Sequence, residues 1–226
     1  MEKIRIFPLG DSALTVEFGK IVSASLNETS IALSKHFERS PFPGFIESVP
    51  AYASTTIFYD LVTVRRAFPE FASAFDAVKA LADKAITSLD RTSTTNNPVI
   101  EIPVHFDQGS ALDLEYVAGQ SGLSTENVVE IFTQRTYRVF MLGFLPGFTY
   151  MGEVDDRIAV PRKESPRLCV PKGSVGIAGK QTGIYSLDSP GGWQIIGRTD
   201  VDMFTPEADS PTYLQPGDQV RFLAVK

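Results

Sequence analysis

Residues 173–199 read GSVGIAGKQTGIYSLDSPGGWQIIGRT, a stretch in which short apolar and β-branched runs alternate with glycine and proline. The same alternation begins at Pro146 and continues toward the C-terminus. Short strands with a turn residue every few positions are typical of a closed barrel and not of a parallel α/β sheet. The sequence therefore predicts a β-barrel in the second half of the chain.

The segment that leads into this stretch predicts two strands and two helices. We expect strands over 99–106 and 137–144, and short helices over 112–119 and 125–134, because their apolar residues follow the strand and helix periods. Ser124 is a suitable N-cap for the second helix. Pro103 lacks a backbone N–H, which indicates an edge or a bulge in the first strand.

A change of composition near residues 90–98 divides the chain. This stretch reads DRTSTTNNP, which is polar and ends in Asn-Pro, as linkers often do. Three of the 17 glycines precede it and fourteen follow it. We therefore predict two domains, residues 1–95 and residues 96–226.

The first domain is predicted to be a small α/β unit. Strands are expected over 3–8, 13–18, 45–49 and 55–59, and helices over 21–38 and 67–89. The second helix shows the clearest helical spacing, at Phe68, Phe71, Phe75, Val78, Ala82, Ala85 and Leu89. The order ββαββα predicts one antiparallel sheet with two helices on one face, so the whole chain is assigned to the α+β class.

Composition excludes several classes of protein. The 226 residues carry a net charge of −6, which argues against a protein dedicated to nucleic acid or to anionic membranes. One cysteine and two histidines leave no internal disulfide and almost exclude a multi-histidine metal site. The N-terminus does not read as a signal peptide, and no apolar run approaches the roughly 20 residues that span a bilayer. A cytoplasmic protein is the simplest interpretation.

The positive charges of residues 157–180 are the clearest chemical signal. This segment holds six cationic residues and one acid, Glu164, within an acidic protein: Arg157, Arg162, Lys163, Arg167, Lys172 and Lys180. The planar guanidinium group suits carboxylate or phosphate, and neighbouring prolines would hold Arg162 and Arg167 in place. The segment therefore predicts an anion pocket, or alternatively a solvated rim with scattered ion pairs.

Other residues of the second half allow two interpretations. Gly147, Gly179, Gly183, Gly191 and Gly192 permit a positive φ or a close backbone approach, and they also fit ordinary turns. Trp193 is either a pocket wall or core, and Gln181 either lines a cleft or bonds to a turn.

The chain shows no complete catalytic constellation. Cys169 lies in an apolar Leu-Cys-Val context that predicts a buried side chain, and only His105 could act as a base for it. No GxxxxGK[ST] motif occurs. The absence of a self-contained active site favours a protein that shares its chemistry with a partner.

Four segments carry a family resemblance. They are GFLPGFTYMG (143–152), PRKESPRLCVPKGSVGIAGKQTGIY (161–185), SPGGWQIIGRT (189–199) and LQPGDQVRF (214–222). On these motifs the chain resembles the KipI/allophanate hydrolase subunit 1 family, which includes the B-type subunit of 5-oxoprolinase and the carboxyltransferase subdomains C and D. The likeness is dense from Pro103 to Phe222, and before residue 95 it consists mostly of element order.

The resemblance implies a ferredoxin-like domain followed by a cyclophilin-like β-barrel. It implies the B-type subunit of an ATP-dependent 5-oxoprolinase, which opens the lactam of 5-oxoproline to glutamate. Such a protein would act with a paralogous cyclophilin-like C-type subunit and a LamB/YcsF-like A-type subunit, and ATP would be used by the complex. Relatives also include KipI-type inhibitors of a histidine kinase and carboxyltransferase-like parts of allophanate hydrolase or urea amidolyase, and fold does not choose among these.

Combined with the anion pocket, the resemblance assigns roles to eight residues. We expect catalytic roles for Arg162, Arg167 and Gln181, with Gln181 recognising an amide. We expect a small carboxylate substrate to be bound by Pro146, Gly147, Phe148, Trp193 and Arg198. The turn at Pro146–Phe148 would supply backbone N–H groups and an aromatic wall.

The chain departs from the family at one position. Relatives often carry a histidine just before the strand expected over 137–144, and Phe132 stands in its place. A proton carried by that histidine in relatives would be lost here or taken from elsewhere.

Overall fold

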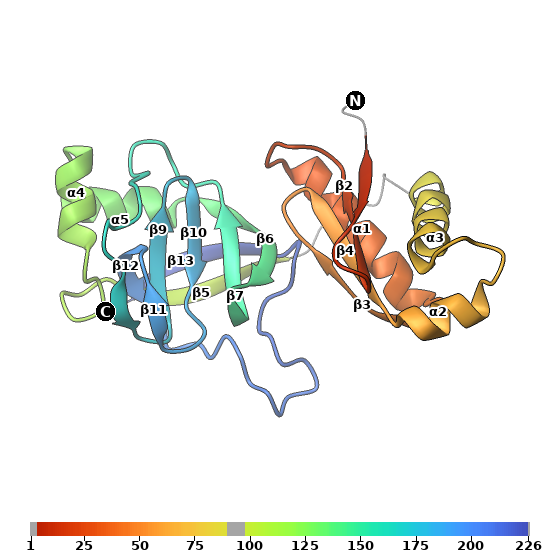
Figure 1. Ribbon diagram of the computed structural model, residues 1–226. Helices are drawn as coiled ribbons and strands as arrows, with labels where there is room; N and C mark the ends of the chain where they lie inside the picture. The colour runs from red at the N-terminus through yellow and green to blue at the C-terminus, as the bar shows by residue number, and fades with distance from the viewer. Residues whose placement is uncertain (1–3, 90–97, 226) are drawn as a thin grey trace. The chain divides into compact units, whose positions relative to one another are not determined.

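The structure is a computed structural model that describes residues 4–89 and 98–225. The chain divides into two compact units, residues 1–96 and residues 97–226 (Figure 1). The predicted linker over 90–98 lies outside the described residues, except for Pro98. The α+β class predicted from the sequence is confirmed, with an antiparallel sheet in the first unit and a closed barrel in the second.

The first unit is a four-stranded antiparallel sheet with helices on one face. The strands β1 (Arg5–Pro8), β2 (Ala13–Glu17), β3 (Phe45–Pro50) and β4 (Ser54–Tyr59) take the order β1-β2-β4-β3. The helices α1 (Ala24–Arg39) and α3 (Ala74–Ser88) pack against this sheet, and Leu33, Phe37 and Val78 meet Leu14 and Ile57 in one core. The predicted order of strands and main helices is therefore confirmed.

Two predicted helix boundaries in this unit are wrong. The first helix begins after Ser23, whose hydroxyl accepts from the Leu26 N–H, so Ile21 precedes the helix and is exposed. The helix predicted over 67–89 begins only at Ala74, as α3, and a separate helix that was not predicted, α2 (Leu61–Ala67), precedes it. The break falls where Pro69 follows Phe68, because the residue before a proline is disfavoured in helical conformation.

The second unit is a closed seven-stranded barrel. Its strands are β5 (Val99–His105), β6 (Thr136–Gly143), β7 (Leu145–Gly152), β9 (Ser174–Ala178), β10 (Gln181–Ile184), β12 (Gln194–Arg198) and β13 (Gln219–Val225). They close in the order β10-β7-β6-β13-β5-β12-β9. A separate two-stranded sheet, formed by β8 (Arg167–Val170) and β11 (Ser189–Gly191), accompanies the barrel.

The first and last strands of the barrel pair with each other in parallel. Seven residue pairs join β5 to β13, from Val99↔Gln219 to His105↔Val225. On its other side β5 meets β12 only at His105. Pro103 therefore faces almost no ladder on that side, which is how the barrel tolerates its missing N–H.

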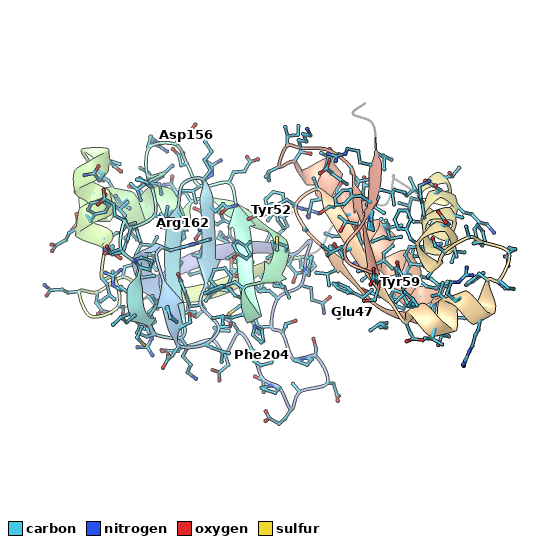
Figure 2. The ribbon with its side chains drawn as sticks, viewed as in Figure 1. Glu47, Tyr52, Tyr59, Asp156, Arg162 and Phe204 are labelled. Carbon is cyan, nitrogen blue, oxygen red and sulfur yellow. The ribbon has the colours of Figure 1, made fainter. Side chains whose placement is uncertain are left out.

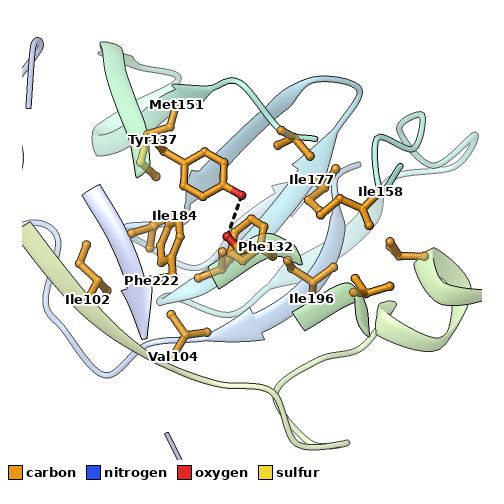
Figure 3. Close-up of a cluster of buried hydrophobic side chains, with 14 of the residues drawn as sticks. Ile102, Val104, Phe132, Tyr137, Met151, Ile158, Ile177, Ile184, Ile196 and Phe222 are labelled. Carbon is orange, nitrogen blue, oxygen red and sulfur yellow. Dashed lines mark hydrogen bonds between the residues drawn. The ribbon is translucent and has the colours of Figure 1, made fainter. Parts of the chain in front are cut away.

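Two helices contribute to the barrel core. They are α4 (Leu114–Ser121) and α5 (Thr125–Thr133), and Ser124 caps α5 as predicted by accepting from the Asn127 N–H at 3.2 Å. Phe132 of α5 is fully buried and stacks on Phe222 at 4.9 Å (Figure 3). Its carbonyl accepts a hydrogen bond from the Tyr137 hydroxyl at 2.9 Å. In this chain position 132 therefore belongs to the core.

None of the helices within residues 4–89 and 98–225 is long and apolar enough to cross a membrane.

Candidate anion site on the barrel

Five aromatic side chains form a cluster, which we call the aromatic cluster: Phe144, Phe148, Tyr150, Tyr185 and Trp193. Ring centroids lie 5.5 Å apart for Phe148 and Trp193, and 5.1 Å apart for Phe148 and Tyr185. Side chains alternate along a strand, and the neighbours Met151 and Ile184 point into the barrel core. The aromatic cluster therefore lies on the opposite, outer face of these strands.

A glycine makes room for these rings. A Cβ built on Gly183 would lie 2.3 Å from the Thr149 carbonyl oxygen, 3.1 Å from the Phe148 ring and 3.2 Å from the Trp193 ring. Only glycine fits such an approach. Of the two interpretations of Gly183, the structure favours close approach over a turn.

Arg162 is an exposed residue of the barrel unit (Figure 2), and it lies over Trp193 of the aromatic cluster. Its guanidinium carbon lies 5.7 Å from the centroid of the Trp193 ring, a cation–π geometry. The Lys163 N–H donates to the Gly192 carbonyl at 2.7 Å, and the Gln194 amide donates to the Pro161 carbonyl at 3.2 Å. Both neighbours of Arg162 are thus tied to the residues that flank Trp193, which holds the backbone of Arg162 beside the indole.

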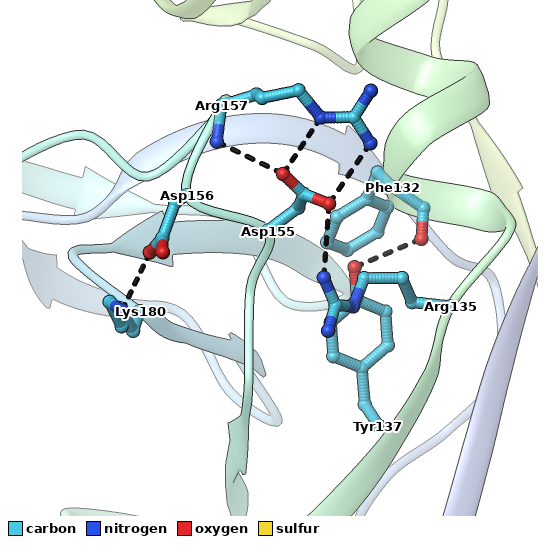
Figure 4. A network of polar contacts seen from close by, with 7 residues as sticks. All are labelled: Phe132, Arg135, Tyr137, Asp155, Asp156, Arg157 and Lys180. Atoms are coloured by element: carbon cyan, nitrogen blue, oxygen red, sulfur yellow. Dashed lines mark hydrogen bonds and ion pairs between the residues drawn. The ribbon is translucent and has the colours of Figure 1, made fainter.

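Arg162 differs from the other cationic residues of its segment. Arg157 pairs with Asp155, and Lys180 pairs with Asp156 (Figure 4). Lys172 pairs with Asp202, while Lys163 and Arg167 both pair with Asp113. Within the part of the chain that the structure describes, Arg162 has no carboxylate partner. Ion pairs therefore account for five of the six cations, at the surface for Arg157, Lys172 and Lys180 and with buried Asp113 for Lys163 and Arg167, and the anion pocket is left to Arg162.

Asp113 organises the pairs that flank Arg162. Its carboxylate accepts two hydrogen bonds from Arg167, both at 2.7 Å, and one from the Ile195 N–H at 2.7 Å. Lys163 adds a contact at 3.3 Å. Burial alone would raise the pKa of the Asp113 carboxyl, but the bonds from Arg167 and Ile195 outweigh it and hold the pKa below its usual value. Arg167 is therefore a neutralised structural cation.

The electrostatics of the tyrosines agree with an exposed positive charge. Burial raises the pKa of Tyr185 and of Tyr150, and the guanidinium of Arg162 opposes both shifts. Both phenols therefore remain neutral and polar beside the cation.

The structure brings some of the predicted site residues together. Trp193 lies under Arg162 and Phe148 packs against Trp193, and each of the two rings is at most 5% exposed. Gln181 begins β10 and shares the face of Gly183, two residues along the strand. Pro146 is exposed beside Phe148. Gly147 is buried with φ 75°, and its Cβ position would meet the Met203 carbonyl at 2.7 Å, so packing accounts for this glycine.

Arg198 lies away from Arg162 and Trp193. It ends β12, whereas Trp193 directly precedes that strand. Five strand residues span roughly 16 Å. Arg198 is exposed beside His105, to which it is paired across the sheet. The three arginines therefore do not converge on one pocket.

The expectation of a buried Cys169 is wrong. The thiol lies on β8 and is exposed, because β8 pairs only with the short β11 and belongs to no closed layer. His105, the base considered for this thiol, instead lies 3.4 Å from the Asp200 carboxylate.

Sequence reasoning missed three residues of the site. Asp113 lies 49 positions before Arg162 and reads locally as an N-cap, and Tyr150 and Tyr185 read as strand aromatics. Strand alternation with Phe148 could have placed Tyr150 on the same face, since the two are two residues apart. Nothing in the local sequence pairs Asp113 with Arg167.

The arrangement defines a class of site. A guanidinium without a carboxylate partner in the described part of the chain lies over an indole, with the phenol groups of Tyr150 and Tyr185 nearby. Such a group binds a carboxylate or phosphate through charge-assisted hydrogen bonds. The chain is thus an α+β protein whose barrel carries a candidate anion site and no self-contained catalytic constellation among its described residues.

Comparison with known proteins identifies the family. Residues 4–214 match the model of the carboxyltransferase domain, subdomain C and D, and the chain belongs to this family. The chain is 42% identical to the B-type subunit of 5-oxoprolinase from Bacillus subtilis (strain 168), over 99% of this chain and 93% of that relative. It is 36% identical to the B-type subunit of 5-oxoprolinase from Escherichia coli O157:H7, over 100% and 98% of the two chains.

A solved structure extends the comparison. The crystal structure of TTHA0988 matches with a TM-score of 0.81 and 36% identity, covering 99% of this chain and 40% of that chain. In that protein the equivalent of both units is part of a longer polypeptide.

Proposed function

We propose that this chain is the B-type subunit of an ATP-dependent 5-oxoprolinase, which opens the lactam ring of 5-oxoproline to glutamate. The observation that carries the proposal is the likeness to two relatives of that name along essentially the whole chain. The name of these relatives describes one part of a larger enzyme. A site without its own base or nucleophile fits such a part, because the remaining groups can come from another polypeptide of the complex.

Arg162 binds the substrate carboxylate in this proposal. It is the cation of its segment without a counter-ion, and its neighbours on both sides are fastened to the residues around Trp193. Holding the backbone of Arg162 in advance lowers the entropy lost on binding. Gln181, on the same face, is assigned to the lactam amide.

The partners in this proposal are a paralogous cyclophilin-like C-type subunit and a LamB/YcsF-like A-type subunit. ATP is used by the assembled enzyme, and we assign to this chain the carboxylate of the substrate and not the nucleotide. The sequence contains no GxxxxGK[ST] loop that would bind phosphates.

Reconstitution tests the proposal. The purified chain is mixed with its A-type and C-type partners, and glutamate formation from 5-oxoproline is measured with and without ATP. We expect activity only with all components. The absence of ATP-dependent glutamate from every combination would refute the function.

Variants at two arginines test the site within that assay. Loss of a hydrogen bond to a charged group is worth about 1.5–3 kcal/mol, so Arg162→Ala should lower kcat/KM by about 10- to 100-fold. Arg198→Ala is the comparison, because Arg198 is also exposed but lies at the other end of β12. An equal loss of kcat/KM in both variants would show that the location of Arg162 above Trp193 does not matter for activity.

A further inference from the structure

A glutamine occupies a position of the barrel where an apolar side chain is expected. Gln194 is the first residue of β12 and is 2% exposed. It lies directly opposite Ile177 of β9, a fully buried member of the barrel core (Figure 3). Residues directly opposite each other project from the same face of a sheet, so Gln194 lies on the face that lines the core. Glutamine is mostly an exposed residue, and its presence on this face needs a physical reason.

Only one half of the Gln194 amide is paired. Its Nε2 donates to the Pro161 carbonyl at 3.2 Å, whereas its Oε1 is buried and has no hydrogen-bond partner among the described residues. A buried acceptor without a partner costs free energy, and an apolar residue of similar volume would avoid that cost. The stability of the core therefore does not account for this glutamine. Departures of this kind from the rules of core packing are expected at functional sites.

The hydrogen bond that Gln194 donates lies beside Arg162. The Pro161 carbonyl that accepts it belongs to the same peptide group as the Arg162 nitrogen. The bond restricts rotation of this peptide group, and it thereby limits the directions in which the Arg162 side chain can leave the backbone. Gln194 thus influences the location of the guanidinium through the backbone.

The peptide group that follows Arg162 is held as well. The Lys163 N–H donates to the Gly192 carbonyl at 2.7 Å. The two residues that flank Trp193 therefore hold the two peptide groups that flank Arg162, whose guanidinium carbon lies 5.7 Å from the centroid of the Trp193 ring. Of these two bonds, the one from Gln194 comes from a side chain, so a substitution can remove it and leave the other in place.

We propose that Gln194 is a positioning residue for Arg162, which keeps the guanidinium over Trp193, where it binds the carboxylate of the substrate. This inference rests on the proposed function, because it takes Arg162 as the carboxylate ligand. The polar side chain is retained in an apolar core because it sets the location of Arg162, and not because it stabilises the barrel.

The first measurement locates Arg162 in the full-length chain without a ligand. The ring current of Trp193 shifts the NMR signals of protons over the indole, so the side-chain signals of Arg162 report its place above the ring. The wild type is compared with Gln194→Met and Gln194→Leu, which lack the amide and are of similar size. The matched control is Thr182→Val, because the Thr182 hydroxyl is also buried and donates to a carbonyl, that of Gly176 at 2.9 Å, but from a different strand, β10.

We expect both Gln194 variants to lose most of the ring-current shift at Arg162. They should melt at the wild-type temperature or above it, because the unpaired buried acceptor is gone and the exposed Pro161 can bond to water. Thr182→Val should keep the shift and melt at a lower temperature, because it leaves a buried carbonyl without its donor.

The second measurement uses the reconstituted enzyme. The Gln194 variants should raise KM for 5-oxoproline by about 3- to 10-fold, the size of one hydrogen bond, and leave kcat nearly unchanged, because the bond acts on substrate binding. Thr182→Val should leave KM unchanged. A role of Gln194 in barrel stability alone would not separate KM from kcat in this way.

Three results of the first measurement would overturn the inference. They are unchanged Arg162 signals in the Gln194 variants, the same displacement in Thr182→Val, and a loss of folding in both Gln194 variants, which would assign the side chain to structure. The wild-type complex decides the proposed function separately. Displaced Arg162 signals without glutamate from any wild-type combination would support the positioning by Gln194 and refute the 5-oxoprolinase, whereas an active Gln194→Met complex with unchanged KM would do the opposite.

Discussion

At position 183 the barrel has room for a hydrogen atom but not for a methyl group. Gly183→Ala places a Cβ 2.3 Å from the Thr149 carbonyl oxygen and presses on two rings of the aromatic cluster. We expect this variant to lower the free energy of unfolding of the barrel by about 3 kcal/mol, at the upper end for overpacking, because backbone must move. Denaturant unfolding followed by Trp193 fluorescence measures the change.

Gly119→Ala is the control for that variant. Gly119 lies in helix α4, and a Cβ there meets nothing within 4 Å. Alanine in a helix is favoured over glycine by up to about 1 kcal/mol, so this variant should be neutral or stabilising. An equal decrease in the free energy of unfolding in both variants would show that the close backbone approach at Gly183 does not contribute to stability.

The pairing and burial of single residues can be predicted from the sequence in some cases and not in others. The cationic segment with its prolines draws attention to Arg162, and that residue is the unpaired one. Arg167 carries the same local signals, yet it is neutralised by Asp113, which lies 54 residues earlier in the chain. The apolar neighbours of Cys169 predict burial, but exposure depends on which strands lie alongside, and β8 has only β11. The ion pairing of Arg167 depends on a contact with a segment that is distant in the sequence, and the exposure of Cys169 depends on strand pairing.

Among the elements, the start of α4 is unusual in its use of Asp113. An aspartate at this position ordinarily caps its own helix, yet Asp113 makes no side-chain cap bond and directs its carboxylate to Arg167 and Lys163. Asp113→Asn leaves these cations without a counter-charge, and we expect a loss of about 3 kcal/mol in barrel stability at pH 7.

The contribution of Asp113 to the free energy of unfolding depends on pH. The folded pKa of Asp113 lies below the ordinary value of 3.8, so its ionised form stabilises the fold at every pH above that value. The stabilisation is lost as the pH falls through the lower, folded pKa. The difference in free energy of unfolding between the wild type and Asp113→Asn should therefore have its full size at pH 6 and decrease below about pH 4. A difference that does not change over this range would assign the effect to shape and not to charge.

The helix α3 begins later than its apolar spacing suggests, and its cap explains why. The Ser73 hydroxyl accepts from the Asp76 N–H at 3.0 Å and donates to the Asp76 carboxylate at 2.7 Å. Ser73→Ala should lower the stability of the first unit by about 1 kcal/mol, read as faster amide hydrogen exchange in α3. Ser25→Ala, at an exposed position in the different helix α1, should leave the exchange of α3 unchanged. Similar exchange rates of α3 in the wild type and both variants would show that the Ser73 cap does not stabilise this helix.

Sequence patterns predict elements well where one local rule acts alone. Ser124 and α5 follow from a cap and a helical period, and both are confirmed. The helix expected over 67–89 is found only from Ala74 on, because the 3–4 spacing continues through Phe68 and Phe71 while Pro69 interrupts the backbone. Both phenylalanines still pack against the core of the first unit, so before Ala74 the apolar spacing reflects burial without a helix.

At the scale of the molecule, each unit has a hydrophobic core of its own. The core of the first unit contains residues from Leu14 to Ala85, and the cores of the second contain residues from Ile102 to Phe222. We predict that residues 97–226 fold when expressed alone. The emission maximum of Trp193 and the melting transition should match those of the barrel in the full chain, and a fragment without cooperative unfolding would contradict the prediction.

The glycine distribution of the sequence predicts the division into sheet and barrel, but not how the barrel closes. Strands adjacent in the chain, such as β6 and β7, can be paired from a short turn. The parallel pairing of β5 with β13 joins segments 120 residues apart. No local pattern encodes such a pairing, because the two strands are far apart in the sequence and no short turn joins them.

That parallel closure has a consequence for biosynthesis. Until residues 219–225 have left the ribosome, β5 and β6 each present an unpaired edge where β13 will later lie. A nascent barrel of this topology remains open for most of its translation and is prone to misassociate during that time. Holding chaperones should therefore engage this protein late, and premature termination within the last strand should yield an aggregating product instead of a slightly shortened one.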